Sequence, residues 1–357
     1  MNTTQRSPRP QLNGLVAGQK AESKIVSNKR TGFMIYTVRG EITLAGAAAT
    51  TIFNGGSLAS LLDFIGFSDA GDDRAYWPAL NFLALTSRMG FSAGANVRLT
   101  TVANGVYPLV ETIVMPFAWD GPMGSSAPWE TCHLQPDPRQ DSTAWVIPNL
   151  NTALLVDAGA TISSPVTVDV TQVYDDDIGK LPFFIPKFSP IQQSIPGAVV
   201  NLPFYLKVSN PLRGIIFSQV DSVAGIVTDI ITSVRLLDDA PDGTYIGSSS
   251  DLWDDLVRDE ARRYGAAPFL GNNVATGVPA DMSGLGTYFH NWQDGGRLSN
   301  IYNPRNAGNN LQLQITGQPS VVGGGSASVN AGLIELEQIP GKTAIPTLPD
   351  GRPIFQF

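Results

Sequence analysis

Alternating apolar and polar residues run through most of this chain and predict a protein built from β-strands. Near the start, the apolar residues Met34, Tyr36 and Val38 alternate with polar ones. Successive residues of a strand point to opposite sides, so this pattern indicates a half-buried strand. Similar segments follow in both halves of the chain, and the predicted strands are 32–44, 97–102, 110–115, 166–171, 199–206, 214–219, 226–235, 311–315 and 327–336.

Two helix-like segments interrupt the strands, one in each half. The first covers 57–66, where apolar residues recur at helical spacing: Leu58, Leu61, Leu62 and Ile65. The second covers 250–265, with acidic residues early and arginines late, which complements the helix dipole. Its predicted buried stripe is Leu252, Leu256, Val257, Ala261 and Tyr264. A strand-rich unit of about 150 residues that occurs twice predicts two β-sandwiches in tandem.

Prolines divide the chain into four parts. Four of them between 178 and 196 mark a boundary between two sandwich domains, because proline clusters favour turns and linkers. We therefore expect a first domain at 31–185 and a second at 186–340. The remaining parts are an N-terminal arm at 1–30 and an extended C-terminal tail at 341–357.

The N-terminal arm is basic, although the chain as a whole is acidic. It contains one acidic residue, Glu22, and six basic ones: Arg6, Arg9, Lys20, Lys24, Lys29 and Arg30. The arm has no periodic apolar face, so we expect it to be flexible and not to fold by itself. Two interpretations stay open, a terminus without a role and an arm that binds an anionic surface.

Charged residues are scarce. They make up 15% of the chain, whereas soluble globular proteins average about 25%. Two explanations fit, namely that neighbouring copies cover much of the surface or that the chain is a weakly charged, loop-rich sandwich. The net charge of −8 argues against broad electrostatic binding of nucleic acid, which needs lysine and arginine to neutralise phosphates.

The sequence carries no segment that predicts export or membrane insertion. No apolar run reaches the roughly 18 residues that indicate a membrane-spanning helix. Residues 1–30 lack the apolar core of a signal peptide. We therefore expect synthesis in a cytoplasm without export. The single cysteine, Cys132, excludes an intrachain disulfide.

No catalytic, cofactor-binding or metal-binding motif is complete. The segment 341–343 resembles the end of a phosphate-binding loop, but Leu336 stands where a glycine is required. Cys132 and His133 are adjacent, and adjacent residues of an extended chain point apart, so they cannot form a nucleophilic pair. We expect an inert, buried thiol. The sequence therefore predicts a protein without enzymatic activity, cofactor or metal.

Two kinds of cluster are weaker signals. Acidic clusters could supply oxygen ligands to Ca²⁺, but none has EF-hand spacing, and solvated turns are their expected role. These clusters are Asp69, Asp72 and Asp73, Asp175 to Asp177, and Asp238, Asp239 and Asp242. An aromatic group with a nearby arginine could stack on nucleic-acid bases, but it lacks a basic groove. This group is Phe289, His290, Trp292 and Arg297.

The order of these features resembles the major capsid proteins of tectivirus-like, membrane-containing icosahedral phages. In the first half the likeness lies in the string 55–65 followed by 76–83. In the second half it lies in the strand 226–237 followed by 250–255, and in the string 301–313 near the C-terminus. The resemblance covers about residues 30–340 and is one of pattern and element order.

The resemblance implies an all-β fold of two tandem eight-stranded jelly rolls, a double jelly roll, with short inserted helices. It also implies a homotrimer whose six jelly rolls form a pseudo-hexagonal capsomer of an icosahedral virion over an internal lipid membrane. The expected partners are further copies of the chain, vertex (penton) and minor capsid proteins, and the membrane through the N-terminal arm. No direct nucleic-acid contact is expected, and synthesis would occur in the host cytoplasm.

A second function stays open, that of an extracellular β-sandwich protein that binds or cleaves carbohydrate. It predicts a platform of exposed aromatic residues, for which Trp119, Trp129 and Trp145 are candidates. All three lie in the long connection 116–148, which is expected to lack secondary structure. Connections of this length are usually functional or pack on a partner.

Overall fold

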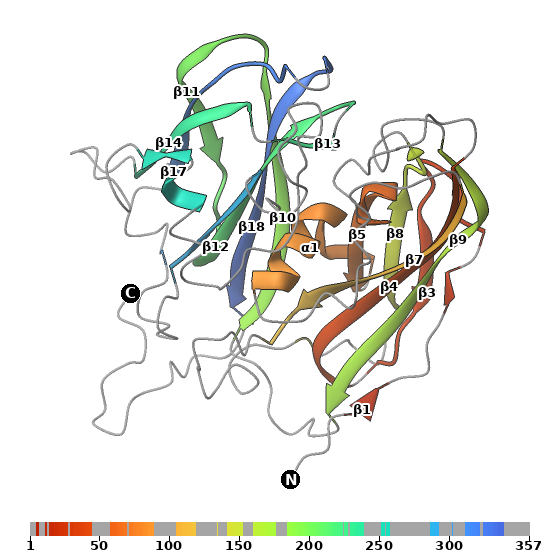
Figure 1. Ribbon diagram of the computed structural model, residues 1–357. Helices are drawn as coiled ribbons and strands as arrows, with labels where there is room; N and C mark the ends of the chain where they lie inside the picture. The colour runs from red at the N-terminus through yellow and green to blue at the C-terminus, as the bar shows by residue number, and fades with distance from the viewer. Residues whose placement is uncertain are drawn as a thin grey trace, which may run out of the picture.

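Figure 1 shows the computed structural model of the chain. The residues that it describes are 5–6, 11–12, 14–27, 29–44, 58–69, 71–88, 105–118, 134, 141–152, 160–175, 184–223, 225–227, 229–238, 251–253, 255–257, 286–292, 302, 311–321 and 324–338.

Strands dominate both halves of the chain. Those of the first half are β1 (Gln5–Arg6), β2 (Gln11–Leu12), β3 (Ala21–Lys24), β4 (Arg30–Leu44), β5 (Leu62–Asp69), β6 (Asp72–Pro78), β7 (Gly105–Pro116), β8 (Ser142–Pro148) and β9 (Ala160–Asp175). Those of the second half are β10 (Phe184–Ile195), β11 (Val199–Leu206), β12 (Leu212–Asp221), β13 (Gly225–Ile226), β14 (Ile231–Asp238), β15 (Asp251–Leu252), β16 (Thr287–Asn291), β17 (Leu311–Gly317) and β18 (Ala327–Gln338). The first half also contains the 3₁₀ helix η1 (Leu58–Leu61) and the helix α1 (Ala79–Arg88).

The strands form three sheets that make two sandwiches. The first outer sheet has the order β1-β9-β4-β7, with β2 also paired to β9, and the second outer sheet has the order β11-β17-β14-β15. The shared sheet runs through both halves in the order β13-β12-β18-β10-β6-β5-β8-β3, with β16 paired to β12. The two outer sheets lie at opposite ends of the molecule, with α1 between them (Figure 1).

The first core lies between the first outer sheet and strands β5, β6 and β8 of the shared sheet. Met34, Tyr36 and Val38 of β4 are completely buried in it, together with Ile65 and Phe67 of β5. The alternation in β4 thus has the cause expected from its sequence, since one side of the strand faces a hydrophobic core.

The second core lies between the second outer sheet and strands β12 and β18. Leu313 and Ile315 of β17 are buried in the same cluster as Ile215 and Phe217 of β12. The opposite side of β12 is buried as well, because Ile216 belongs to the first core. In a strand covered on both faces apolar residues can follow one another directly, as Ile215, Ile216 and Phe217 do in β12.

The two halves are joined through the shared sheet and through α1. Strands β10 and β6 run parallel, with Phe188 opposite Ala75. The rings of Phe82 in α1, Trp77 and Phe188 lie 4.9 to 5.3 Å apart, centroid to centroid. Such aromatic packing adds to the stabilisation from buried area. The junction between the halves is therefore part of a hydrophobic core and not a linker.

Most strands expected from the sequence are confirmed, although their ends differ. The predicted strands 32–44, 110–115, 166–171, 199–206, 214–219, 311–315 and 327–336 fall within β4, β7, β9, β11, β12, β17 and β18. The predicted strand 97–102 lies outside the described residues.

The predicted helix at 57–66 is wrong for most of its length. Only η1 is helical, and Leu62 begins the strand β5. Residues Ile65 to Ser68 are all buried, so β5 has apolar or small residues on both sides. A doubly covered strand gives a pattern that also fits a short helix, and the packing of neighbouring strands decides between them.

Two predictions in the second half are partly wrong. The predicted strand 226–235 is divided into β13 and β14. In the predicted helix 250–265, residues 251–252 form the strand β15, and Leu252 is 60% exposed instead of buried. Trp253 begins a helical segment, and Val257 is buried as expected. The remainder of that prediction lies outside the described residues.

Two stretches expected to be irregular contain strands. The connection 116–148 includes β8, whose Trp145 is 2% exposed. The proline-rich boundary 178–196 includes the 12-residue strand β10. Proline removes only the hydrogen bond that its own N–H would make, so β10 keeps twelve register pairs with β18.

Candidate assembly site

The N-terminal segment closes the open side of the first sandwich. Strand β2 pairs with β9 of the first outer sheet, and β3 pairs with β8 of the shared sheet. Residues 11–27 therefore reach from one sheet to the other, and we call them the clasp. Leu12 is buried in the first core, and Leu15 and Ile25 pack against it. The clasp thus completes the core and covers two sheet edges, which are otherwise sites of unwanted strand pairing.

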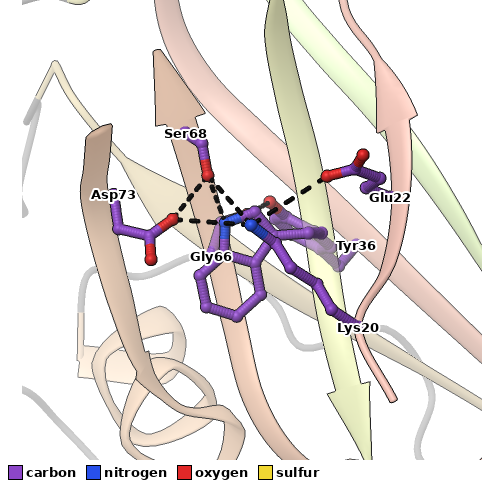
Figure 2. Close-up of polar contacts among 7 residues, drawn as sticks. Lys20, Glu22, Tyr36, Gly66, Ser68 and Asp73 are labelled. Atoms are coloured by element: carbon purple, nitrogen blue, oxygen red, sulfur yellow. Dashed lines mark hydrogen bonds and ion pairs between the residues drawn. The ribbon is translucent and has the colours of Figure 1, made fainter. Parts of the chain in front are cut away.

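The clasp is held by a polar cluster around Lys20 (Figure 2). The Lys20 ammonium lies 4.6 Å from the ring centroid of Trp145, a cation–π geometry. It also lies 3.4 Å from Ser68 Oγ and 3.6 Å from the carboxylate of Asp73. Glu22, two residues further along the chain, is 3.9 Å away. One cation thus links the clasp to strands β5, β6 and β8.

The Trp145 side chain is fixed from several directions. Its Nε1–H donates to Ser68 Oγ at 2.7 Å, and Ser68 donates in turn to Asp73 at 2.5 Å. The indole ring lies directly over Gly66, where any Cβ atom would collide with it. Because the indole N–H is hydrogen-bonded, its burial avoids the penalty of an unpaired buried donor. The position facing Trp145 must therefore be glycine.

Tyr36 holds the core-facing side of strand β5 at Gly66. Complete burial raises the pKa of its hydroxyl, so the group stays protonated. It donates to the carbonyl oxygen of Gly66 at 2.7 Å (Figure 2). The backbone at Gly66 is thus held by a hydrogen bond from the core and by an aromatic ring from the clasp side.

A second anchor lies at the C-terminal end of the clasp. The side-chain amide of Gln172 in β9 accepts from Val26 N and donates to Val26 O, both at 3.0 Å. Lys24 pairs with Asp141 at 2.9 Å, but both side chains are more than 70% exposed. An exposed pair of this kind contributes little to stability, so the amide clamp on Val26 is the stronger hold.

The six basic residues expected in a flexible arm therefore have different environments. Lys20 and Lys24 make the contacts described above, and the Lys29 ammonium lies 5.4 Å from the ring centroid of Tyr174. Arg30 begins β4 and is 4% exposed. Arg6 belongs to β1, which pairs with β9, and Arg9 lies outside the described residues.

The sequence predicted that residues 1–30 form a flexible arm. This prediction is wrong for the clasp, whose strands β2 and β3 pair with β9 and β8. Sequence reasoning missed it because a four-residue strand with the side chains Ala-Glu-Ser-Lys has no apolar periodicity. Its pairing partner β8 lies more than a hundred residues away along the chain. The signal that could have found it is Leu12, Leu15 and Ile25, three apolar residues in a polar segment.

Helix α1 carries two polar contacts from the first half to the second. Ser218 of β12 donates to the side-chain oxygen of Asn81 at 2.5 Å, and both residues are buried. Arg88, 2% exposed, donates to the carbonyl oxygen and to the hydroxyl of Thr287 in β16. Buried polar groups need such partners, and these contacts fix how the halves lie against each other. The sequence did not predict α1, a helix in which every residue with a described side chain except Leu80 is buried.

The structure gives no support to a catalytic or metal site within its described part. No group of three or more metal-ligating side chains occurs there. Asp69 and Asp73 accept hydrogen bonds from Ser142 and Ser68 at the ends of strands, the structural role expected of turn residues. The side chains of Asp175 to Asp177, Asp238, Asp239 and Asp242 lie outside the described part.

The aromatic candidates pack within the protein. Trp145 is buried, so it does not belong to an exposed sugar platform, and Trp119 and Trp129 lie outside the described residues. Phe289 is buried in the first core, and the rings of His290 and Trp292 contact each other at 4.6 Å between centroids. Where the structure describes the chain, no helix is long and apolar enough to span a membrane.

Comparisons with known proteins match the fold and not the sequence. No protein-family model matches the chain, and no curated protein sequence matches it. A chain in the atomic structure of Sulfolobus turreted icosahedral virus (STIV) matches with a TM-score of 0.69 and 15% identity, over 98% of this chain and 94% of that one. The crystal structure of the STIV major capsid protein gives 0.66 and 14%, over 94% and 97%.

The major capsid protein P2 of bacteriophage PM2 gives a TM-score of 0.50 and 10% identity, over 94% of this chain and all of that one. At such identities the likeness defines the fold. The chain has the double jelly-roll fold of viral major capsid proteins, so the fold expected from the sequence and from the family resemblance is confirmed.

Proposed function

We propose that this chain is the structural major capsid protein of an icosahedral virion. In this proposal three copies form a pseudo-hexagonal capsomer, and many capsomers form a shell over an internal lipid membrane. Vertex (penton) and minor capsid proteins complete the shell. The chain would be made in a host cytoplasm and reside in the virion.

The observation that carries the proposal is the likeness to viral major capsid proteins over the whole length of the chain. These proteins match over 94 to 98% of it, both sandwiches included. Function does not follow from fold alone, so the surface matters as well. Only 15% of the residues are charged, which suits a protein whose faces are covered by further copies.

The proposal includes no enzymatic turnover and no direct nucleic-acid contact. A hydrolase needs a nucleophile, a base and a group that orients the base, and the described residues bring no such set together. The net charge of −8 disfavours phosphate binding over a broad surface. The carbohydrate-binding alternative gains nothing from Trp145, because this residue is buried.

The membrane contact is proposed for a shorter segment than the whole arm. Lys20 and Lys24 already contact acidic groups of the same chain, and Arg30 is buried. Residues 1–10, with Arg6 and Arg9, precede the clasp and are the part that we propose to lie toward the lipid. Basic residues near an anionic membrane contribute about 1 kcal/mol each.

Light scattering on the purified full chain tests the oligomeric state. The expected mass is three times that of the 38.0 kDa chain at micromolar concentration. Electron microscopy at higher protein concentration should show hexagonal tiles of uniform size. A monomer at all concentrations up to the solubility limit would contradict the proposal.

A further inference from the structure

A row of polar side chains crosses the shared sheet on the side that α1 covers. It takes one residue from each of four neighbouring strands, in register with one another: Thr287 of β16, Ser218 of β12, Asn330 of β18 and Gln192 of β10. Register partners of antiparallel strands project to the same side of a sheet. The row faces α1, because Ser218 donates to Asn81 of that helix.

Three buried polar atoms beside this row have no hydrogen-bond partner in the described part of the chain. They are the donors Asn81 Nδ2 and Trp77 Nε1 and the acceptor Asn330 Oδ1. Asn81 is 1% exposed, and Trp77 is completely buried. Folded proteins pair nearly all such groups, either with other protein atoms or with ordered water.

The two amides lie on either side of one hydroxyl group. The Asn81 side-chain oxygen accepts from Ser218 Oγ at 2.5 Å, so the nitrogen of the same amide lies close to this hydroxyl. Ser218 is the register partner of Asn330, which brings the Asn330 amide to the same hydroxyl from the neighbouring strand. A donor from α1 and an acceptor from β18 thus lie near each other without a direct hydrogen bond between them.

The Trp77 ring covers the next position of β18 on the same side of the sheet. A Cβ atom on Gly332 would lie 2.6 Å from Trp77 Cε2, the ring carbon that is bonded to Nε1. Gly332 and Asn330 are two residues apart, so their positions on this side of the sheet are separated by about 7 Å. The indole N–H is therefore the second donor next to the Asn330 side chain.

The polarity of the three atoms selects the ligand that can join them. It must accept from Asn81 Nδ2 and Trp77 Nε1 and donate to Asn330 Oδ1. A metal cation cannot accept a hydrogen bond, and an anion without a proton cannot donate one. Water does both, and buried waters typically make about three hydrogen bonds.

We propose that one ordered water molecule binds at this junction, accepting from Asn81 Nδ2 and Trp77 Nε1 and donating to Asn330 Oδ1. Trp77 and Asn81 belong to the first half of the chain and Asn330 to the second, so the water links the two sandwiches. All three residues come from one copy, and the site is therefore independent of the proposed capsid function.

A crystal structure of the full chain, at a resolution that shows ordered waters, tests the site directly. A density peak is expected within about 2.7–3.2 Å of each of the three atoms, the usual hydrogen-bond distance. The proposal would be overturned by ordered side chains with no peak between them, or by a direct bond from Asn81 Nδ2 to Asn330 Oδ1.

Substitutions of Asn330 test the site in solution. Asn330→Leu has nearly the same shape but no acceptor, so oxygen-17 relaxation dispersion should count one long-lived internal water fewer than in the unchanged protein. Asn330→Asp keeps an acceptor oxygen and should retain the full count. Gln192→Leu is the matched control, because Gln192 lies in the same row but is exposed, and its amide donates to Ser328 Oγ at 3.1 Å.

The control should also retain the full count of internal waters. An unchanged count in Asn330→Leu, or the same loss in Gln192→Leu, would contradict the proposed site. Circular dichroism shows whether each variant is folded. If Asn330→Leu does not fold, the crystal structure of the unchanged protein decides by itself.

Discussion

At the scale of single residues, the contact between Gly66 and Trp145 shows how one position can be restricted by a distant part of the chain. Gly66 and Trp145 are register partners on β5 and β8. The indole covers the glycine, and the Tyr36 hydroxyl holds its carbonyl oxygen from the other side. Since protein interiors are densely packed, neither the ring nor the backbone has space to move.

The substitution Gly66→Ala should therefore lower the free energy of unfolding by about 1–3 kcal/mol, the usual cost of overpacking a core. Denaturant unfolding at fixed chain concentration measures it. Gly197→Ala is the matched control, because no atom lies within 4 Å of the added Cβ. The control should change stability by less than about 0.5 kcal/mol. Equal effects of the two substitutions would contradict the steric role of Trp145.

At the scale of elements, the clasp is a short segment whose structure comes entirely from its neighbours. Strand β3 has four residues, none of them fully buried, and so small a strand is not stable alone. It becomes ordered because β8 offers hydrogen-bonding groups, Lys20 meets Asp73, and Gln172 clamps Val26. The clasp therefore belongs to the first sandwich, whereas residues 1–10 precede it.

Two truncations should separate these roles. Removing residues 1–27 exposes two sheet edges and the core around Leu12, and should lower the free energy of unfolding by at least about 2 kcal/mol, the value of one buried leucine. Among the described elements, removing residues 1–10 deletes only the two-residue strand β1. It should therefore affect the unfolding transition much less, but should weaken binding to phosphatidylserine vesicles by about 30-fold, because Arg6 and Arg9 are lost. Calorimetry and vesicle sedimentation measure the two effects.

Phosphatidylcholine vesicles, which carry no net charge, are the control for the vesicle experiment. Unchanged vesicle binding without residues 1–10 would rule out their membrane role. An unchanged transition without residues 1–27 would show that the clasp does not stabilise the sandwich.

At the scale of the whole molecule, the two sandwiches form one body because a sheet and a buried helix cross between them. The first core includes Phe188, Ile216 and Ile334 from the second half of the chain. The hydrogen bond between Ser218 and Asn81 also fixes the orientation of the two halves, since hydrogen bonds require a defined geometry. In the proposed function, a capsomer of fixed shape needs such a fixed angle between its jelly rolls.

A double-mutant cycle at this junction tests the coupling of the halves. Asn81→Ala and Ser218→Ala should each cost about 1–3 kcal/mol, because each leaves a buried polar group without its partner. The double variant should cost less than the sum, with a coupling of at least about 0.5 kcal/mol. Unfolding in guanidinium at fixed concentration provides the values. Ser163→Ala, which removes an exposed contact with Glu41, serves as control, and strictly additive costs would argue against the coupling.

The sequence by itself determined the strands that have one buried face. In β4 and β17 the apolar residues alternate with polar ones, and the structure buries Tyr36 and Leu313 as expected. Alternation is a local property, because it follows from the geometry of a single strand above a core. The same reasoning gave the all-β class and the tandem arrangement, whereas the resemblance to major capsid proteins rested on particular strings and on the order of the elements.

Only the tertiary structure decided the elements whose environment is built by distant residues. Strand β5 is covered on both faces, so its sequence lacks the alternation that separates strand from helix. Helix α1 is set in place by buried contacts with the second half of the chain, through Asn81 and Arg88. Trp145 is buried through Ser68 and Gly66, which lie more than seventy positions away, and the clasp is ordered through β8 and Gln172, more than a hundred positions away. Contacts between distant residues depend on the completed fold, and for that reason no local pattern specifies them.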